Sequence, residues 1–351
     1  MTTGFIDLYS DTKSRPTAAM RQFMMAAEVG DEQKNEDPTV RRLCERVATL
    51  LGKEAAVLLP SGTMCNEIAL AVHCRPGDEV ICHRTAHIIH FEAGGPAVIA
   101  GVVLRGLDGQ AGRFGAADLA AACRPDSRHA PRSRLVSVEQ TANLGGGAIW
   151  PLQTIREVMA TARAAGLAGH LDGARLLNAV VASGVPAADY AAPFDSAWID
   201  LTKGLGAPVG AVLAGSAGFV HEAWRWKQRL GGAMRQAGIL AAAGLHALDH
   251  HVERLAEDHA HARRLAEGLA ALPGVAIDPA TVETNIVIFD IAGTGWRADQ
   301  LVAAAAARQV GLGAFGPTTV RAVTHLDVSG TDIEAALAAI GMILAGPAPR
   351  G

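Results

Sequence analysis

Short apolar runs alternate with longer amphipathic stretches through about the first 216 residues of the chain. Helix-length segments such as TMCNEIALAVHC and PLQTIREVMATARAAG separate several of these runs. Strands that alternate with helices in this way pair through crossover connections. The sequence therefore predicts an α/β fold with a mostly parallel sheet flanked by helices. The expected strands are 54–60, 79–83, 97–104, 134–140, 167–172, 196–201 and 209–215.

The pattern changes after residue 216. Residues 219–272 have a helical pattern for most of their length, interrupted by the glycine pair at 231–232. A strand over 283–291, a helix around 297–309 and a strand over 320–329 are expected to follow. We therefore place a large domain at 31–250 and a small C-terminal α+β domain at 251–351, with an N-terminal segment, 1–30, that packs near the small domain.

Composition excludes several functional classes. The net charge of the 351 residues is -4 without a run of Lys or Arg, which argues against nucleic-acid binding. No uninterrupted apolar run reaches the roughly 18 residues of a membrane span. The N-terminus lacks a signal-peptide pattern, and the five cysteines show no CxxC spacing. These features predict a cytoplasmic protein with no membrane partner.

Lys203 follows an apolar run and stands in the glycine-rich turn TKGLGAPVG. A lysine that acts as a nucleophile must lose its proton and approach a carbonyl closely, and small neighbours leave room for a planar ligand. Asp172 ends another apolar run, so both residues are expected at one edge of the sheet. An aspartate keeps the pyridine nitrogen of pyridoxal phosphate (PLP) protonated. The alternatives are a surface lysine and a helix N-cap.

Phosphate and ring contacts have candidates nearby. Gly62 and Thr63 open an expected helix, whose free N–H groups can bind a phosphate, and Thr202 adds a hydroxyl beside the lysine. An ordinary helix cap is the alternative. His87 can stack on a pyridine ring or move protons near it. His83 stands four residues before it, but no third ligand of suitable type follows, so we predict no metal site.

A substrate carboxylate requires a guanidinium partner, for which Arg175 and Arg321 are the candidates. Arg321 opens an apolar strand, where an unpaired charge is costly. An internal salt bridge is the competing interpretation, particularly for Arg321.

Eight motifs follow one another in an order that resembles the L-threonine aldolase family. This family belongs to the fold-type-I PLP-dependent enzymes, in the group of β-eliminating lyases and threonine aldolases. The resemblance covers Ile6 to about Ser329. The motifs are SDTxxRP, VGDxxxxxDPTV, PSGTMxN, AHxxxFEAGG, HLDGAR, SxxxxLTKGLGAPVG, GGAMRQAGILAAAG and RxVTHLDVS.

The resemblance implies a PLP transferase-like fold and roles for matching residues. Lys203 would hold PLP as a Schiff base, Asp172 would pair with the pyridine nitrogen, and His87 would stack on the ring. The remaining roles would be phosphate binding by Gly62, Thr63 and Thr202, carboxylate binding by Ser10, Arg175 and Arg321, and contact with the cofactor of a neighbouring subunit by Arg235. A homo-oligomer, dimer or tetramer, with sites at the dimer interface is also implied.

Two departures from the family pattern surround the expected substrate side chain. The segment 139–144 reads EQTANL where the family has E-N-T-H-N-G, so Ala142 replaces a histidine that contacts the β-hydroxyl. A base role then falls to His87, a water or another group. Lys34-Asn35-Glu36 stands where the family commonly has Y-G-D, and the glycines at 145–147 are also unusual.

The function expected from this resemblance is cleavage of a β-hydroxy-L-amino acid, such as threonine, allo-threonine or phenylserine, to glycine and an aldehyde. PLP-dependent β-elimination or racemisation of a small amino acid is the alternative. A non-catalytic PLP-fold protein is a third hypothesis, against which Lys203 and Asp172 argue.

Overall fold

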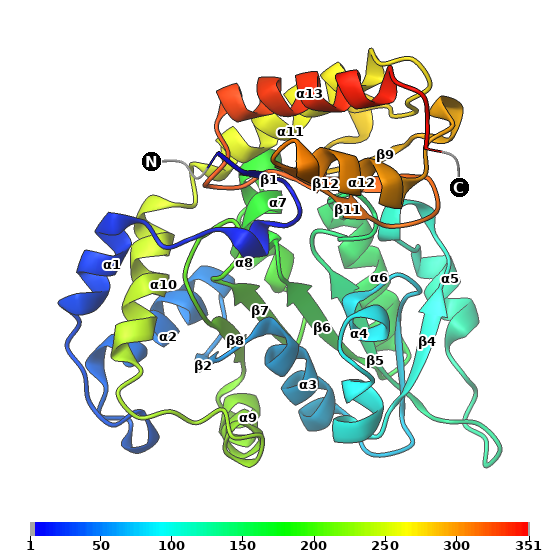
Figure 1. The fold of residues 1–351 in the computed structure, drawn as a ribbon. Coiled ribbons are helices and arrows are strands. Elements are labelled where there is room, and N and C mark those ends of the chain that lie inside the picture. The colour runs from blue at the N-terminus through cyan, green and yellow to red at the C-terminus, as the bar shows by residue number, and fades with distance from the viewer. Residues whose placement is uncertain (1–3, 350–351) are drawn as a thin grey trace.

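The computed structural model describes residues 4–349 of the chain (Figure 1). Residues 1–3 and 350–351, at the outer ends of the two predicted terminal segments, lie outside the described residues. Among the residues described, no helix combines the length and apolarity needed to cross a bilayer.

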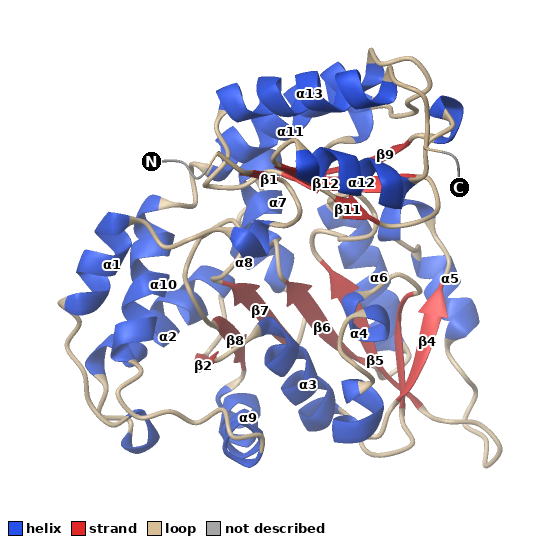
Figure 2. Ribbon diagram, viewed as in Figure 1, coloured by secondary structure: helices blue, strands red, loops and turns tan. Residues whose placement is uncertain are grey.

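A seven-stranded sheet with the order β2-β8-β7-β6-β5-β3-β4 forms the centre of the molecule (Figure 2). Neighbouring strands are parallel from β4 to β7, and only β8 runs against the others. The predicted, mostly parallel sheet is thus confirmed. The strands are β2 (Ala55–Leu59), β3 (Glu79–His83), β4 (Val103–Leu107), β5 (Ser133–Glu139), β6 (Ala168–Gly173), β7 (Ser196–Asp200) and β8 (Ala211–Gly215).

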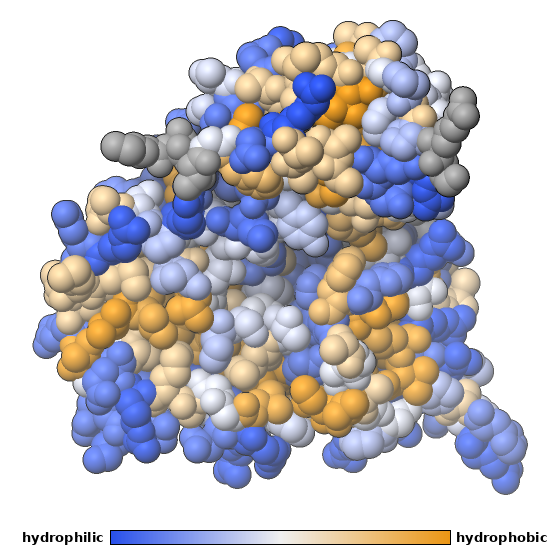
Figure 3. All heavy atoms as spheres, in the orientation of Figure 1, coloured by the Kyte–Doolittle hydropathy of each residue, from blue (hydrophilic) through white to orange (hydrophobic). Residues whose placement is uncertain are grey.

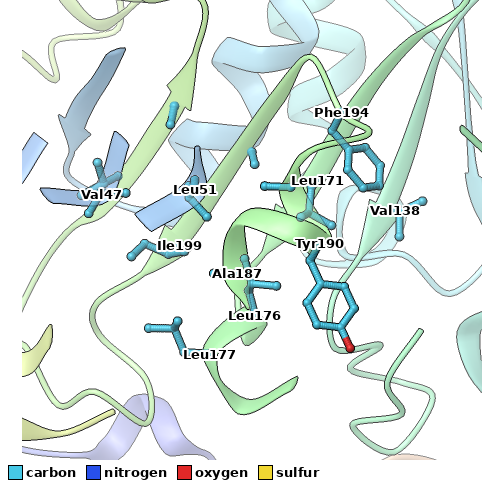
Figure 4. Packing of buried hydrophobic residues seen from close by; sticks show 14 of the residues in the cluster. Val47, Leu51, Val138, Leu171, Leu176, Leu177, Ala187, Tyr190, Phe194 and Ile199 are labelled. Carbon is cyan, nitrogen blue, oxygen red and sulfur yellow. The ribbon is translucent and has the colours of Figure 1, made fainter. Parts of the chain in front are cut away.

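Helices cover both faces of this sheet. They are α1 (Ala18–Met25), α2 (Pro38–Leu51), α3 (Gly62–His73), α4 (His87–His90), α5 (Ala116–Ala122), α6 (Leu152–Ala164), α7 (Leu176–Ser183), α8 (Ala187–Ala191), α9 (Ala217–Arg229) and α10 (Gly238–His250). Side chains of β7 alternate between the faces: Trp198 packs with α3 and α9, while Ala197 and Ile199 join the larger cluster on the other face. Figure 4 shows this larger cluster around Leu171, Tyr190 and Ile199.

One predicted strand is wrong. Residues 97–104 were expected to be extended, but Pro96–Ala100 forms a short helix, η3, and the strand begins only at Val103. Pro96 stands in the first turn of η3, where its fixed φ suits a helix. Gly101 ends the helix with a φ of 68°, a left-handed conformation that favours glycine.

Smaller sheets lie over the carboxyl ends of the central strands (Figure 1). An antiparallel sheet has the order β11-β12-β9, and β1 near the N-terminus pairs with β10. These strands are β1 (Ile6–Asp7), β9 (Ile286–Asp290), β10 (Val310–Gly311), β11 (Gly313–Ala314) and β12 (Thr319–Val323). The helices around them are α11 (Leu255–Ala270), α12 (Ala298–Ala307) and α13 (Gly330–Leu344). The remaining short helical turns are η1 (Asp11–Lys13), η2 (Glu32–Lys34), η4 (Gln110–Gly112), η5 (Pro279–Thr281) and η6 (Ala292–Thr294).

This second layer has a hydrophobic cluster of its own, which includes Leu8 from the N-terminal segment. The division of the chain at residues 30 and 250 remains a prediction. The strands β5, β6 and β7 end with Glu139, Asp172-Gly173 and Asp200, so three carboxylates meet at the edge below the small sheet. Ligands of open α/β sheets bind at this edge.

Candidate active site

A cavity of about 390 Å³ lies at the carboxyl edge of the sheet. Lys203, in the turn after β7, Asp172 of β6 and His87 of α4 all line it. Gly62, Thr63 and Thr202 also contribute to its wall. The structure therefore brings together six of the residues that the sequence singles out, from four separate segments of the chain.

Asp200 organises the turn that carries Lys203. Its Oδ2 accepts a hydrogen bond from Lys203 Nζ at 2.7 Å. Its Oδ1 accepts from both the backbone N–H and the hydroxyl of Thr202, each at 2.7 Å. The Thr202 hydroxyl is thus already committed as a donor. Asp200 fixes both residues with one carboxylate and keeps the amine of Lys203 at the cavity wall.

The N-terminus of α3 forms one end of the cavity. Ser61 caps this helix by accepting from Met64 N–H, and no hydrogen bond within the described residues engages the N–H groups of Gly62 and Thr63. A Cβ at Gly62 would lie 2.3 Å from the Trp198 ring, so only glycine fits beside the indole. Free N–H groups at a helix N-terminus suit a phosphate.

Asp172 is buried, at 3 % exposure, and lines the cavity. Its Oδ2 accepts from Asn66 Nδ2 at 2.9 Å, and its Oδ1 accepts from Ala174 N–H at 3.0 Å. Burial raises the pKa of Asp172, against the opposing effects of His87, Asn66 and Lys203. A buried carboxylate with incomplete compensation fits a cationic partner such as a protonated pyridine nitrogen.

His87 donates or accepts at Nδ1 toward Glu92 Oε1, at 2.8 Å. Burial disfavours its charged form, but the hydrogen bond to Glu92 and the charges of Asp172 and Glu139 outweigh this effect and raise the pKa of His87. Its Nε2 has no partner among the described residues, and the ring lines the cavity. The hydrogen bond to Glu92 therefore fixes the orientation of the imidazole and leaves Nε2 free.

The two other histidines of this segment bind elsewhere. His83 contacts Thr85 Oγ1 and the carbonyl of Gly109, and His90 contacts the carbonyl of Arg84. Within residues 4–349, no three His, Cys, Asp or Glu side chains gather in a way that could hold a metal ion.

A second cavity, of about 230 Å³, adjoins the first and shares Thr12, His87, Ala174 and Lys203 with it. It contains the three residues predicted to bind a carboxylate, Ser10, Arg175 and Arg321. Figure 3 shows that the surface is hollowed between the two layers of the molecule.

The two arginines of this second cavity differ in their partners. Arg175 forms a bidentate pair with Asp11, with both nitrogen–oxygen distances at 2.7 Å. Arg321 has no carboxylate partner: it donates to Asn143 Oδ1 and to the carbonyl of Tyr9, while its buried Nε has no acceptor. Its guanidinium lies 4.1 Å from the centre of the Phe315 ring. Burial and repulsion by Arg175 lower the pKa of Arg321 to about 10.

Three features predicted to bear on the substrate or cofactor lie outside both cavities. Ala142 is buried at 3 % exposure, and its Cβ faces Gly112 and Gly145. Arg235 pairs with Asp31 at 3.1 Å, and 63 % of its side chain is exposed. The segment 34–36 lines neither cavity within this chain. The predicted contact of Arg235 with the cofactor of a neighbouring subunit remains a prediction.

Sequence reasoning missed several residues that hold the site together. They are Asp11, Asn66, Glu92, Glu139 and Asp200. Asp11, Asn66 and Glu92 belong to the family motifs SDT, PSGTMxN and FEAGG. The motifs could therefore have pointed to these residues, although they do not indicate their roles. Glu139 accepts from the N–H groups of His87 and Asn143, each at 2.7 Å. Burial raises the pKa of Glu139 to about 7.

The Asp11–Arg175 pair should make a large contribution to stability. Burial alone would raise the pKa of Asp11, but Arg175 and Lys203 hold it well below its usual range. Since the folded-state pKa is depressed, this contribution is present above about pH 4 and is lost as the pH falls below that value. Replacing Asp11 by Asn leaves Arg175 buried and unpaired, so we expect a loss of about 3–5 kcal/mol in urea denaturation at neutral pH.

Asp299→Asn is the matched control, because Asp299 also pairs with an arginine but both side chains are exposed. Its free energy of unfolding should stay within about 0.5 kcal/mol of the wild type. Equal effects of the two substitutions would contradict a special role for the buried pair.

Known proteins resemble this chain over most of its length. The model of the beta-eliminating lyase family matches residues 7–292. The low specificity L-threonine aldolase of Escherichia coli K12 is 42 % identical over 92 % of this chain and 95 % of its own. The low-specificity L-threonine aldolase 1 of Arabidopsis thaliana is 39 % identical over 94 % and 93 %.

Solved structures show the same fold. The Leishmania major threonine aldolase has a TM-score of 0.82 at 19 % identity, covering 97 % of this chain and 99 % of its own. A putative L-allo-threonine aldolase from Listeria monocytogenes has a TM-score of 0.80 at 21 % identity, covering 97 % and 98 %. The expected fold of fold-type-I PLP enzymes is thus confirmed. The chain belongs to the beta-eliminating lyase family and, within it, to the PLP-dependent threonine aldolases.

Proposed function

We propose that the protein cleaves β-hydroxy-L-amino acids such as threonine, allo-threonine and phenylserine to glycine and an aldehyde. The observation that carries this proposal is the pair of adjoining cavities that share Lys203 and His87. One suits PLP, and the other contains a guanidinium without a carboxylate partner, Arg321. A small amino acid would meet the cofactor where the cavities join.

The residues of the larger cavity fit PLP. Lys203 would hold the cofactor covalently, Asp172 would accept from the pyridine N–H, and the N-terminus of α3 would bind the phosphate. When bound, PLP supplies an electron sink for the bond that breaks at the substrate α carbon. Thr202 supports this site through Asp200, since its hydroxyl is already a donor to that carboxylate.

Arg321 would bind the substrate carboxylate, with Ser10 nearby on the same wall. Arg175 would assist only indirectly, because Asp11 already occupies two of its nitrogens. By fixing the carboxylate, Arg321 would limit rotation at the α carbon and so help to decide which of its bonds breaks. Cleavage of Cα–Cβ gives the aldolase reaction, and loss of the α proton leads to elimination or racemisation.

His87 is the best placed base for the β-hydroxyl. Ala142 has no proton acceptor and lies outside the cavity, whereas His87 presents a free Nε2. Glu139 also lines the cavity, but both of its oxygens already accept backbone N–H groups. In the reaction we propose, Nε2 takes the hydroxyl proton while the Cα–Cβ bond breaks and the aldehyde carbonyl forms.

Product analysis tests the reaction. The PLP-loaded protein, given L-threonine, L-allo-threonine or L-phenylserine, should release glycine and the matching aldehyde in equal amounts, measured together by chromatography. Formation of a keto acid with ammonia, or of the other enantiomer at the α carbon, would instead support β-elimination or racemisation. Glycine without aldehyde would contradict both.

Arg321→Met should weaken substrate binding. Losing charge-assisted hydrogen bonds worth about 1.5–3 kcal/mol predicts a rise in KM of roughly 10–150-fold. Stability should change little, because the guanidinium has no carboxylate partner. Arg264→Met, which breaks an exposed pair with Glu334, is the control and should leave KM unchanged. A normal KM in Arg321→Met would remove this residue from the substrate site.

We also propose a cytoplasmic homo-oligomer, dimer or tetramer, with its sites at the dimer interface. The five cysteines are free thiols, which fits a reducing compartment. Apolar side chains at α1 and α10, Phe23, Met25 and Ile239, are exposed in the single chain (Figure 3). Sedimentation equilibrium at micromolar concentration should give a dimer or larger, and a monomer would contradict the proposal.

A further inference from the structure

Glu67 is an acidic side chain on the buried side of α3, with 2 % exposure. Neither of its oxygens has a hydrogen-bond donor among the described residues, and the same holds for Oε2 of the buried Glu92. The backbone packs tightly here, since a Cβ at Gly95 would clash with Glu67 Oε1. Three buried carboxyl oxygens without partners require an explanation, because each would carry a desolvation cost.

A shared proton supplies that explanation. The side chains of Glu67 and Glu92 contact each other, and burial together with this contact raises the pKa of Glu67 to about 9. Two adjacent buried carboxyl groups do not both ionise at neutral pH. An O–H on one of them, donated to an oxygen of the other, provides partners for two of the three oxygens.

The other contacts of Glu92 decide which group holds the proton. Its Oε1 accepts a hydrogen bond from Asn66 Nδ2 at 2.7 Å and lies 2.8 Å from His87 Nδ1, which donates to it when the ring carries a proton there. The orientation of the Asn66 amide is fixed because its Oδ1 accepts from the indole N–H of Trp198 at 2.8 Å. Glu92 therefore acts as a double acceptor and carries the charge, whereas Glu67 has no donor and carries the proton.

We propose that Glu67 is a positioning residue: as an uncharged acid it donates its O–H to Glu92 Oε2 and so keeps Glu92 an anion that fixes His87 with Nδ1 protonated and Nε2 free. The inference deepens the proposed function, on which its catalytic part rests. Glu67 touches neither cavity and acts on the reaction only through Glu92.

Four charged or titratable groups face His87, and the three acidic ones among them raise its pKa. They are Glu92 from the loop after α4, Glu139 of β5, Asp172 of β6 and, across the shared cavity, Lys203. Glu92 is the only one of them that contacts Glu67. A change confined to Glu67 should therefore reach His87 along this one route.

Two substitutions separate hydrogen bonding from volume. In Glu67→Gln the amide still donates to Glu92, whereas in Glu67→Leu no donor remains. We expect Glu67→Gln to keep the wild-type pKa of His87 and Glu67→Leu to lower it by about one unit, because Glu92 loses support for its charge. NMR titration of the imidazole in the cofactor-free protein measures this without any reference to activity.

The pH dependence of kcat in the PLP-loaded protein should show the same difference between the two variants. His87 accepts a proton only when neutral, so kcat falls as the pH drops through its pKa. This acidic limb should move to lower pH in Glu67→Leu and stay in place in Glu67→Gln, with little change in KM for either. The proposal would be overturned if His87 kept its wild-type pKa in Glu67→Leu, or if its pKa shifted equally in both variants.

Infrared spectroscopy keeps the inference testable if Glu67→Leu does not fold. At about pH 8, above the pKa of Glu139 and below that of Glu67, the wild-type protein should show the C=O band of a buried protonated acid, and this band should be lost in Glu67→Gln. Its absence from the wild type would overturn the shared proton. A negative aldolase assay with the band and the NMR shift intact would refute the proposed function while leaving the Glu67–Glu92 contact as inferred.

Discussion

The side chain of Asn66 forms hydrogen bonds to four residues around the active site, and the arrangement of the site depends on them. It donates to Glu92 and Asp172 and accepts from Trp198 and His170, so it joins α3, β6, β7 and the loop after α4. All four contacts are buried. Because the amide can take only one orientation among these partners, it requires both Glu92 and Asp172 to act as acceptors.

The charge states of the site follow from this constraint. An ionised Asp172 is the stronger acceptor for the pyridine N–H of a cofactor, and an ionised Glu92 is the stronger acceptor for the N–H of His87. Hydrogen bonds to Asn66 and His87 offset part of the cost of burying these carboxylates. The guanidinium of Arg175 is balanced by Asp11 within the chain, which leaves Arg321 as the cation that a substrate carboxylate would balance.

The sequence was sufficient for features that depend on local pattern. The parallel sheet, the turn around Lys203, Asp172 at a strand end and the helix start at Gly62 all come from short contiguous stretches. It failed where partners are far apart along the chain: Arg175 and Asp11 are 164 positions apart, and Asn66 and Asp172 are 106 apart. The apolar run 97–104 was misjudged because Pro96 and Gly101 outweigh its β-branched residues.

The central claim is that His87, oriented by Glu92, takes the proton of the β-hydroxyl in place of the histidine that Ala142 replaces. The most direct test is kcat for L-threonine cleavage by PLP-loaded His87→Gln, with His90→Gln as the control because His90 contacts only the Arg84 carbonyl among its hydrogen-bond partners. Loss of a general base predicts a fall in kcat of about 10²–10⁴-fold for His87→Gln and none for the control. A kcat within a few-fold of the wild type, with PLP still bound, would contradict this role of His87 and indicate that water accepts the proton of the β-hydroxyl.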